Sequence, residues 1–180
     1  MKYLFRGKSY SSLRKLYREF EEITPTNTWR GNVKEEWCDY NGHLNLAYYV
    51  VIFDLATDAF YDALGLGKTY KNITNHSWFT AESHVCYVSE VFAGTEIYCT
   101  TQLIGFDKKR MHYFHRMYRV TGHILVATNE LLALHVDLKE RRVTEAVTAA
   151  LDPLQRILVN HQALPRPKQL GSKISIPPKI

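Results

Sequence analysis

The chain has 180 residues, of which 46% are hydrophobic, so it is long enough for one domain with a substantial core. Its net charge of +5 comes from the two ends: residues 1–18 carry six Lys and Arg and no acid, and residues 165–180 carry four and no acid. Residues 19–164 hold the other 13 Lys and Arg and all 18 Asp and Glu, which argues against a nucleic-acid-binding surface.

The first segment, residues 1–28, is a basic N-terminal extension that ends in the polar linker ITPTNT. Leu13, Leu16, Tyr17 and Phe20 fall on one helical face of a stretch rich in Arg, Lys and Ser. Such a stretch resembles a mitochondrial presequence, but short basic amphipathic stretches are common, so an ordinary basic amphipathic helix is the preferred interpretation. The first interpretation places the protein in the mitochondrial matrix, and the second leaves it in the cytoplasm.

Other global features favour the cytoplasm. The three cysteines, an odd number without CxxC spacing, argue against a disulfide framework and a zinc site and favour a reducing compartment. No apolar stretch reaches the roughly 20 residues of a membrane-spanning helix, and the N-terminus lacks the apolar block of a secretory signal. We therefore expect neither a membrane nor a nucleic acid as partner.

A central domain is expected over residues 29–164. An extended segment from residue 29 to 37 leads into a turn at DYNG, residues 39–42, with Asp at its first position and Gly at its last. The following residues, 46–64, predict a helix that is apolar almost all round. A helix of that composition is enclosed by the rest of the fold.

Four β-rich runs follow, separated by short turns, at residues 78–91, 95–106, 110–120 and 124–138. Successive strands joined by such turns predict an antiparallel meander. One more helix at about 151–162 precedes an extended, proline-containing tail, residues 165–180. The pattern predicts an α+β fold in which a curved antiparallel sheet wraps around one long central helix.

The order of strand, D-x-x-G-H-x-N motif, long helix and meander resembles the hotdog-fold acyl-CoA thioesterases of the 4-hydroxybenzoyl-CoA thioesterase-like superfamily. Asp39, Gly42, His43 and Asn45 carry the motif. Four further segments are similar to the betainyl-CoA thioesterase group of that superfamily: TAESHVCY (80–87), GFDKKRMHYFHRMY (105–118), ATNELLALHVDLKERR (127–142) and LPRP (164–167).

The resemblance implies a function as well as a fold. It implies hydrolysis of a short acyl-CoA, such as the betainyl-CoA of carnitine and betaine metabolism, to the free acid and coenzyme A, without a cofactor. It also implies a homodimer or homotetramer with active sites where subunits meet. Two alternatives stay open: a thioesterase for a hydroxybenzoyl-type or medium-chain acyl-CoA, and a non-catalytic protein that binds acyl-CoA or acyl carrier.

Asp39, His43 and Asn45 are the predicted catalytic residues. The matching Asp of the family acts as a general base or as a nucleophile, and N–H groups at the helix start after Asn45 can bind the oxyanion of the tetrahedral intermediate. Each residue also has a structural interpretation. Asp39 can form the turn, His43 can bond to neighbouring backbone, and Asn45 can cap the helix.

The predicted substrate-binding residues are Gly42, Trp37, Tyr48, Tyr49 and Glu82. Gly42 permits close approach of the backbone to a ligand. The aromatic rings suit a quaternary ammonium group, which cannot be hydrogen-bonded. Glu82 lies on a polar strand face with Thr80, His84 and Cys86, counted by strict alternation. Aromatic residues in the core and a strand face in solvent are the alternatives.

The phosphates of coenzyme A need exposed cations, for which Lys109 and Arg110 at a hairpin tip and Arg142 after the last strand are the candidates. Surface solubility is the alternative explanation for each. His112 and His115 are three apart in a predicted strand and point to opposite faces. We therefore expect no metal site.

Overall fold

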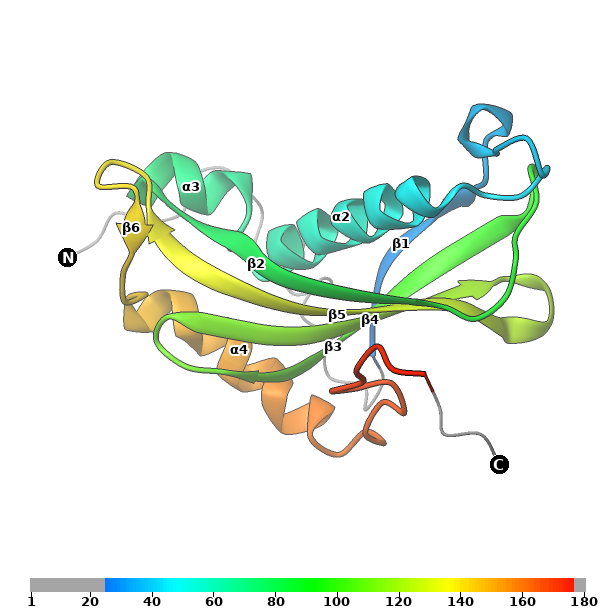
Figure 1. Ribbon diagram of the computed structural model, residues 1–180. Coiled ribbons are helices and arrows are strands. Elements are labelled where there is room, and N and C mark those ends of the chain that lie inside the picture. The colour runs from blue at the N-terminus through cyan, green and yellow to red at the C-terminus, as the bar shows by residue number, and fades with distance from the viewer. Residues whose placement is uncertain (1–24, 177–180) are drawn as a thin grey trace, which may run out of the picture.

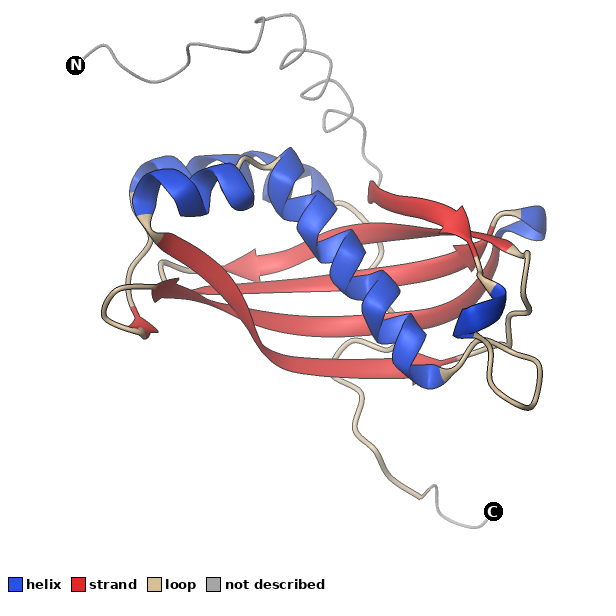
Figure 2. Cartoon of the chain, turned by 90° about the horizontal axis from the view of Figure 1, so that it is seen from above, coloured by secondary structure: helices blue, strands red, loops and turns tan. Residues whose placement is uncertain are grey.

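The computed structural model describes residues 25–176, in which a curled antiparallel sheet wraps around one side of a long helix, α2 (Figures 1 and 2). The elements follow one another as β1 (Thr26–Asn32), the 3-10 helix η1 (Glu35–Trp37), α2 (Leu46–Ala63), α3 (Lys68–Thr74), β2 (His76–Tyr87), β3 (Glu96–Phe106), β4 (Arg110–Arg119), the 3-10 helix η2 (Thr121–His123), β5 (Ile124–Asp137), β6 (Arg142–Val143) and α4 (Thr148–His161). The predicted α+β hotdog architecture is confirmed. The helical pattern at residues 13–20 lies outside the described residues.

The strands lie side by side in the order β1-β3-β4-β5-β2, with β6 added to β5. The predicted meander is right for β3, β4 and β5, and wrong for β2, which pairs with β5 instead of β3. The connection at residues 88–95 is too long for a tight hairpin. It crosses the sheet and binds the loop before α2, where the Leu44 N–H donates to the Val91 carbonyl at 2.7 Å.

Helix α2 buries one face and exposes the other. Its buried residues recur every three or four positions, as expected for a helix packed on one side: Tyr49, Ile52, Phe53, Ala56, Thr57, Phe60 and Tyr61. The prediction that α2 is enclosed all round is wrong for the single chain. An apolar stripe formed by Val50, Val51 and Leu55 is 42–44% exposed. None of the described helices is both long and apolar enough to cross a membrane.

The two edges of the sheet, next to β3 and at β2, differ in how they are covered. Strand β1 pairs only with the first half of β3. Helix α4 covers the second half, where His161 Nδ1 accepts a hydrogen bond from the Leu103 N–H at 2.8 Å. At the opposite side β2 pairs with β5 alone, so within the described chain one edge of this 12-residue strand has no neighbour. Exposed edges of this length usually pair with another chain or are protected by charge or irregularity.

Strand β2 contains a β-bulge. Its register with β5 shifts between Thr80 and Glu82, so Ala81 is an extra residue in the strand. The prediction that Thr80 and Glu82 share a face by strict alternation is therefore wrong, because the bulge resets the alternation between them.

The tail folds back on the sheet. The Gly171 N–H donates to Glu130 Oε2 at 2.6 Å, and Glu130 Oε1 lies 2.9 Å from His112 Nε2. Glu130 therefore holds the segment that follows α4 against β5.

Candidate functional site

The DYNGHLN segment forms a tight hairpin before α2. The Asp39 N–H donates to the His43 carbonyl at 3.0 Å, and the Gly42 N–H donates to the Asp39 carbonyl at 2.9 Å. Gly42 has a φ of 82°, a conformation that glycine adopts without strain. One step outward, the Asn45 N–H donates to the Trp37 carbonyl at 2.9 Å. These bonds hold Asp39 across from the residues that start α2.

The three predicted catalytic residues meet in this hairpin, and each makes the local bond expected of its structural role. Asp39 Oδ1 accepts from the Asn41 N–H at 2.8 Å, His43 Nδ1 lies 3.4 Å from the Leu44 carbonyl, and Asn45 Oδ1 accepts from the Ala47 N–H at 3.0 Å. Asp39 Oδ2 has no hydrogen-bond partner among the described residues. Asp39 therefore keeps one carboxylate oxygen available for chemistry.

The start of α2 also offers an unused donor. The Ala47 and Tyr48 N–H groups donate to Asn45, whereas the Leu46 N–H has no acceptor in the described part of the chain. It lies in the first turn of an 18-residue helix, where the helix dipole favours negative charge. A carboxylate oxygen and an N–H donor, both without a partner among the described residues, thus lie in the segment through which the chain enters α2.

The predicted aromatic residues divide into two groups. Trp37 and Tyr48 stack beside the hairpin, with ring centroids 5.7 Å apart, and Lys34 Nζ lies 5.0 Å from the Trp37 ring. Tyr49 is only 4% exposed, and burial raises the pKa of its hydroxyl to about 12. Trp37 and Tyr48 therefore border the hairpin, while Tyr49 packs in the core.

The predicted CoA-binding cations lie far from Asp39 in the single chain. Lys109 and Arg110 follow the far end of β3, which at 11 residues is about 35 Å long, and Arg142 lies in β6 near the same end. Arg110 is already paired with Asp107 at 2.6 Å, and this bond raises the pKa of Arg110 and lowers that of Asp107. Glu82 is exposed in the middle of β2, away from both the Asp39 hairpin and these cations.

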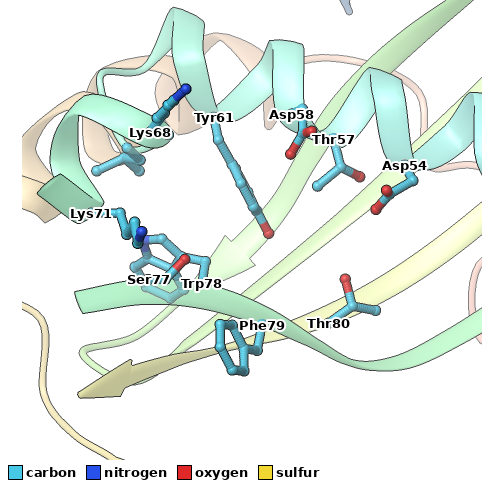
Figure 3. A pocket seen from close by; sticks show the side chains of 12 residues that line it. Asp54, Thr57, Asp58, Tyr61, Lys68, Lys71, Ser77, Trp78, Phe79 and Thr80 are labelled. Atoms are coloured by element: carbon cyan, nitrogen blue, oxygen red, sulfur yellow. The ribbon is translucent and has the colours of Figure 1, made fainter. Parts of the chain in front are cut away.

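A second candidate region, which the sequence-based prediction missed, lies at the other end of α2. A pocket of about 510 Å³ opens between α2, α3 and β2 (Figure 3). Asp54, Thr57, Asp58 and Tyr61 of α2 line it. The signal in the sequence was the spacing of Asp54, Asp58 and Asp62, which recur every four residues in an otherwise apolar helix.

The pocket is acidic on its α2 side. Neither Asp54 nor Asp58 makes an ion pair or hydrogen bond with a described residue. Burial, together with the nearby carboxylates of Asp54 and Asp62, raises the pKa of Asp58. Burial also raises the pKa of Tyr61 well above its ordinary value, so Tyr61 stays neutral. Within residues 25–176 no three His, Cys, Asp or Glu side chains gather as a metal site.

A buried network of hydrogen bonds connects the lining residues Thr57 and Tyr61 to the sheet. His115, fully buried, lies 2.9 Å from Thr57 Oγ1 through Nε2 and 2.8 Å from Thr101 Oγ1 through Nδ1. The hydroxyls of Tyr61 and Tyr113 lie 3.1 Å apart. Burial lowers the pKa of His115 to about 3, so the ring is neutral. Thr57 and Tyr61 are thereby fixed by partners on the sheet.

Comparison with known proteins defines the class. The family model of the thioesterase-like superfamily matches residues 33–170, and the chain belongs to this superfamily. The betainyl-CoA thioesterase of Pseudomonas aeruginosa is 36% identical over 151 residues, which are 84% of this chain and 95% of that protein. The predicted thioesterase class is confirmed.

Two further relatives extend the comparison. The L-carnitine dehydrogenase/betainyl-CoA thioesterase of a Rhizobium species is 30% identical over 93% of this chain, which spans only 33% of that relative. A Staphylococcus aureus protein solved in complex with CoA is 26% identical, with a TM-score of 0.79, and the match covers 87% of this chain and 99% of that one.

Proposed function

We propose that the chain hydrolyses betainyl-CoA to betaine and coenzyme A. The observation that carries the proposal is the hairpin that holds Asp39 beside the unpaired N–H at the start of α2, in a chain of the thioesterase-like superfamily. The P. aeruginosa relative supports the choice of acyl group. Hydrolysis needs only water, so the proposal includes no cofactor and no metal.

Asp39 and the Leu46 N–H have different roles in the reaction. A water oxygen attacks the thioester carbonyl carbon while Asp39 accepts the water proton, and the oxyanion accepts a hydrogen bond from the Leu46 N–H. The C–S bond then breaks, and the leaving thiolate of coenzyme A takes up the proton. In the alternative route, Asp39 attacks the carbonyl carbon itself and water hydrolyses the resulting anhydride.

We propose that the active unit is a homodimer formed through β2. The unpaired edge of β2 and the exposed stripe of Val50, Val51 and Leu55 support this arrangement. Helix α2 and strand β2 run in opposite directions. Tyr87, at the end of β2, contacts Leu46 at the start of α2, while the first residues of β2 line the pocket beside the last turns of α2. Antiparallel pairing of two β2 strands about their midpoints brings the pocket of one subunit beside the Asp39 hairpin of the other.

The same pairing accounts for the predicted CoA-binding cations. Lys109, Arg110 and Arg142 lie at the same end of the sheet as the pocket. A dimer of this kind therefore brings them toward the partner's Asp39 hairpin. We further propose that the protein acts in the cytoplasm, which the free thiols of Cys38, Cys86 and Cys99 support. The mitochondrial alternative depends on residues 1–28, of which 1–24 lie outside the described part of the chain.

The test is release of free thiol from betainyl-CoA, acetyl-CoA, an aromatic acyl-CoA and a medium-chain acyl-CoA. We expect the highest kcat/KM for betainyl-CoA. A preference for the aromatic or medium-chain ester would replace the substrate while keeping the thioesterase. Tight binding of every ester without turnover would favour a binding protein and contradict the proposal.

A further inference from the structure

The pocket at the end of α2 combines negative charge with aromatic surface. The carboxylates of Asp54 and Asp58 line the side formed by α2, and neither has a partner among the described residues. The rings of Tyr61 and Trp78, from α2 and β2, line the same cavity (Figure 3). Trp78 is 5% exposed, and its Nε1 is buried without a hydrogen-bond partner in the described chain.

Two hydroxyls of the pocket are already engaged. Thr57 Oγ1 lies 2.9 Å from His115 Nε2, and the Tyr61 hydroxyl lies 3.1 Å from that of Tyr113. Tyr61 therefore presents its ring to the cavity instead of a free hydroxyl. Fixed rings and unpaired carboxylates suit a cation that carries no N–H, because such a group is held by charge and by aromatic faces.

Other charged groups around the pocket do not remove this polarity. Lys68 and Lys71 line the side formed by α3, so acid and base lie on opposite sides of the cavity. Figure 3 shows Phe79 pointing away from α2, and the Arg141 guanidinium lies 5.9 Å from the centroid of its ring. Figure 3 shows Lys71 beside Trp78, whereas the Tyr61 ring extends from α2, the helix that carries the two carboxylates.

The distance along α2 determines which Asp39 the pocket can serve. Asp54 and Asp58 lie about 12 Å and 18 Å along the helix from Leu46. In a betainyl group only one methylene separates the carbonyl carbon from the nitrogen. A thioester bound at Asp39 therefore cannot place its ammonium in the pocket of the same chain, but the β2-paired dimer brings the partner's pocket to it.

We propose that Asp54, Asp58, Tyr61 and Trp78 form the site that recognises the acyl group, and that it selects acyl groups with a permanent cation. The site acts across the subunit boundary, on the thioester held at the partner's Asp39. This assignment rests on the proposed function and specifies its substrate class. Asp54 and Asp58 are specificity residues, whereas Asp39 performs the chemistry.

The experiment compares two esters of the same shape. Betainyl-CoA and 3,3-dimethylbutanoyl-CoA differ only in a charged nitrogen or a neutral carbon at the branch point. We expect the wild type to prefer the cationic ester by about 100-fold in kcat/KM, and Asp54→Asn or Asp58→Asn each to reduce this ratio about tenfold. The kcat/KM for the neutral ester should fall less than that for betainyl-CoA, whereas a merely structural effect would lower both alike.

The matched control is Asp62→Asn, which removes the same charge from the same helix but lies outside the pocket. Because the Asp62 carboxylate helps to raise the pKa of Asp58, its removal favours the ionised form of Asp58, so Asp62→Asn should not lower the ratio. Equal loss of preference in Asp62→Asn, or an unchanged ratio in the Asp54 and Asp58 variants, would overturn the assignment, while continued hydrolysis would leave the thioesterase function standing.

A binding experiment tests the cation site even if the proposed thioesterase function is wrong. If the wild type hydrolyses neither ester, calorimetric titration with glycine betaine and with 3,3-dimethylbutanoate decides the assignment. Binding of glycine betaine that is stronger than that of its neutral counterpart, and that is lost in Asp58→Asn, would support the cation site. Equal binding of the two, or no binding of either, would overturn it.

Discussion

The two ends of α2 carry different chemistry and are built differently. At its start, Asp39 is held by backbone bonds within a seven-residue hairpin, and one of its oxygens has no partner among the described residues. At its end, Thr57 and Tyr61 are fixed by side chains of the sheet, from residues 52 to 58 positions away. The two ends of α2 therefore have separate roles. A local turn holds the reactive group, while hydrogen bonds between α2 and β4 fix the shape of the recognition site.

The most direct way to separate the two ends is to remove one charge from each. Asp39→Asn should lower kcat by about 1,000-fold with little change in KM, because the amide can neither accept the water proton nor attack. Asp58→Asn should instead raise the KM for betainyl-CoA and affect kcat less. Steady-state kinetics of both variants, with circular dichroism to confirm folding, make the comparison.

Two results would contradict this division. If Asp39→Asn kept kcat within a factor of a few, the hairpin would not hold the reactive group. If Asp58→Asn lowered kcat as strongly as Asp39→Asn, both carboxylates would act in the chemistry, and the two ends would not have separate roles.

The next largest effect should come from separating the subunits. Val51→Glu combined with Leu55→Glu places charge on the exposed stripe of α2, so it should disrupt a dimer without unfolding the chain. Light scattering should show the mass falling from twice 21.0 kDa to 21.0 kDa. The value of kcat/KM should fall at least about 100-fold, because the monomer cannot bring the pocket to Asp39.

Val159→Glu is the matched control, since Val159 is a 61% exposed apolar residue on α4, away from β2. It should change neither mass nor activity. A wild-type protein that is monomeric and fully active would show that one chain contains the whole site.

The same contrast explains what the sequence could predict. The hairpin was predictable because its hydrogen bonds from Trp37 to Ala47 join residues no more than eight positions apart, and turn and cap residues such as Asp39, Gly42 and Asn45 have strong local preferences. The pocket was not, because it needs α2 and β2 to be placed by contacts such as Thr57 with His115. The bulge at Ala81 and the pairing of β2 with β5 were missed for the same reason: alternation and turn length carry no information on distant partners.

The buried network at the pocket end predicts a loss of stability in acid. His115 has a pKa of about 3 in the folded chain, against an ordinary value of 6.5 that the unfolded chain regains. Between these values the unfolded state binds a proton that the folded state does not, so stability falls as pH drops below 6.5. From pH 7 to pH 5 this group should cost about 2 kcal/mol of the free energy of unfolding.

Urea denaturation of the wild type and His115→Gln at both pH values isolates this contribution. His135 also has a lowered pKa and adds a slope of the same sign, so the difference between the two proteins is the informative quantity. The variant should be less stable at pH 7, and its deficit should shrink at pH 5. Identical pH dependence in the two proteins would show that His115 titrates normally.

The smallest effect concerns Asn45, which is either a helix cap or a catalytic amide. Asn45→Ala should lower the free energy of unfolding by about 1 kcal/mol because the Ala47 N–H loses its acceptor. Asn45→Ser keeps an oxygen that can accept this bond but removes the amide N–H group. We expect it to keep wild-type stability in urea denaturation and kcat within about threefold, because a cap needs only the acceptor. A stable Asn45→Ser protein as inactive as Asp39→Asn would instead make the amide a donor in the reaction, and the oxyanion would then depend on a side chain as well as on the Leu46 N–H.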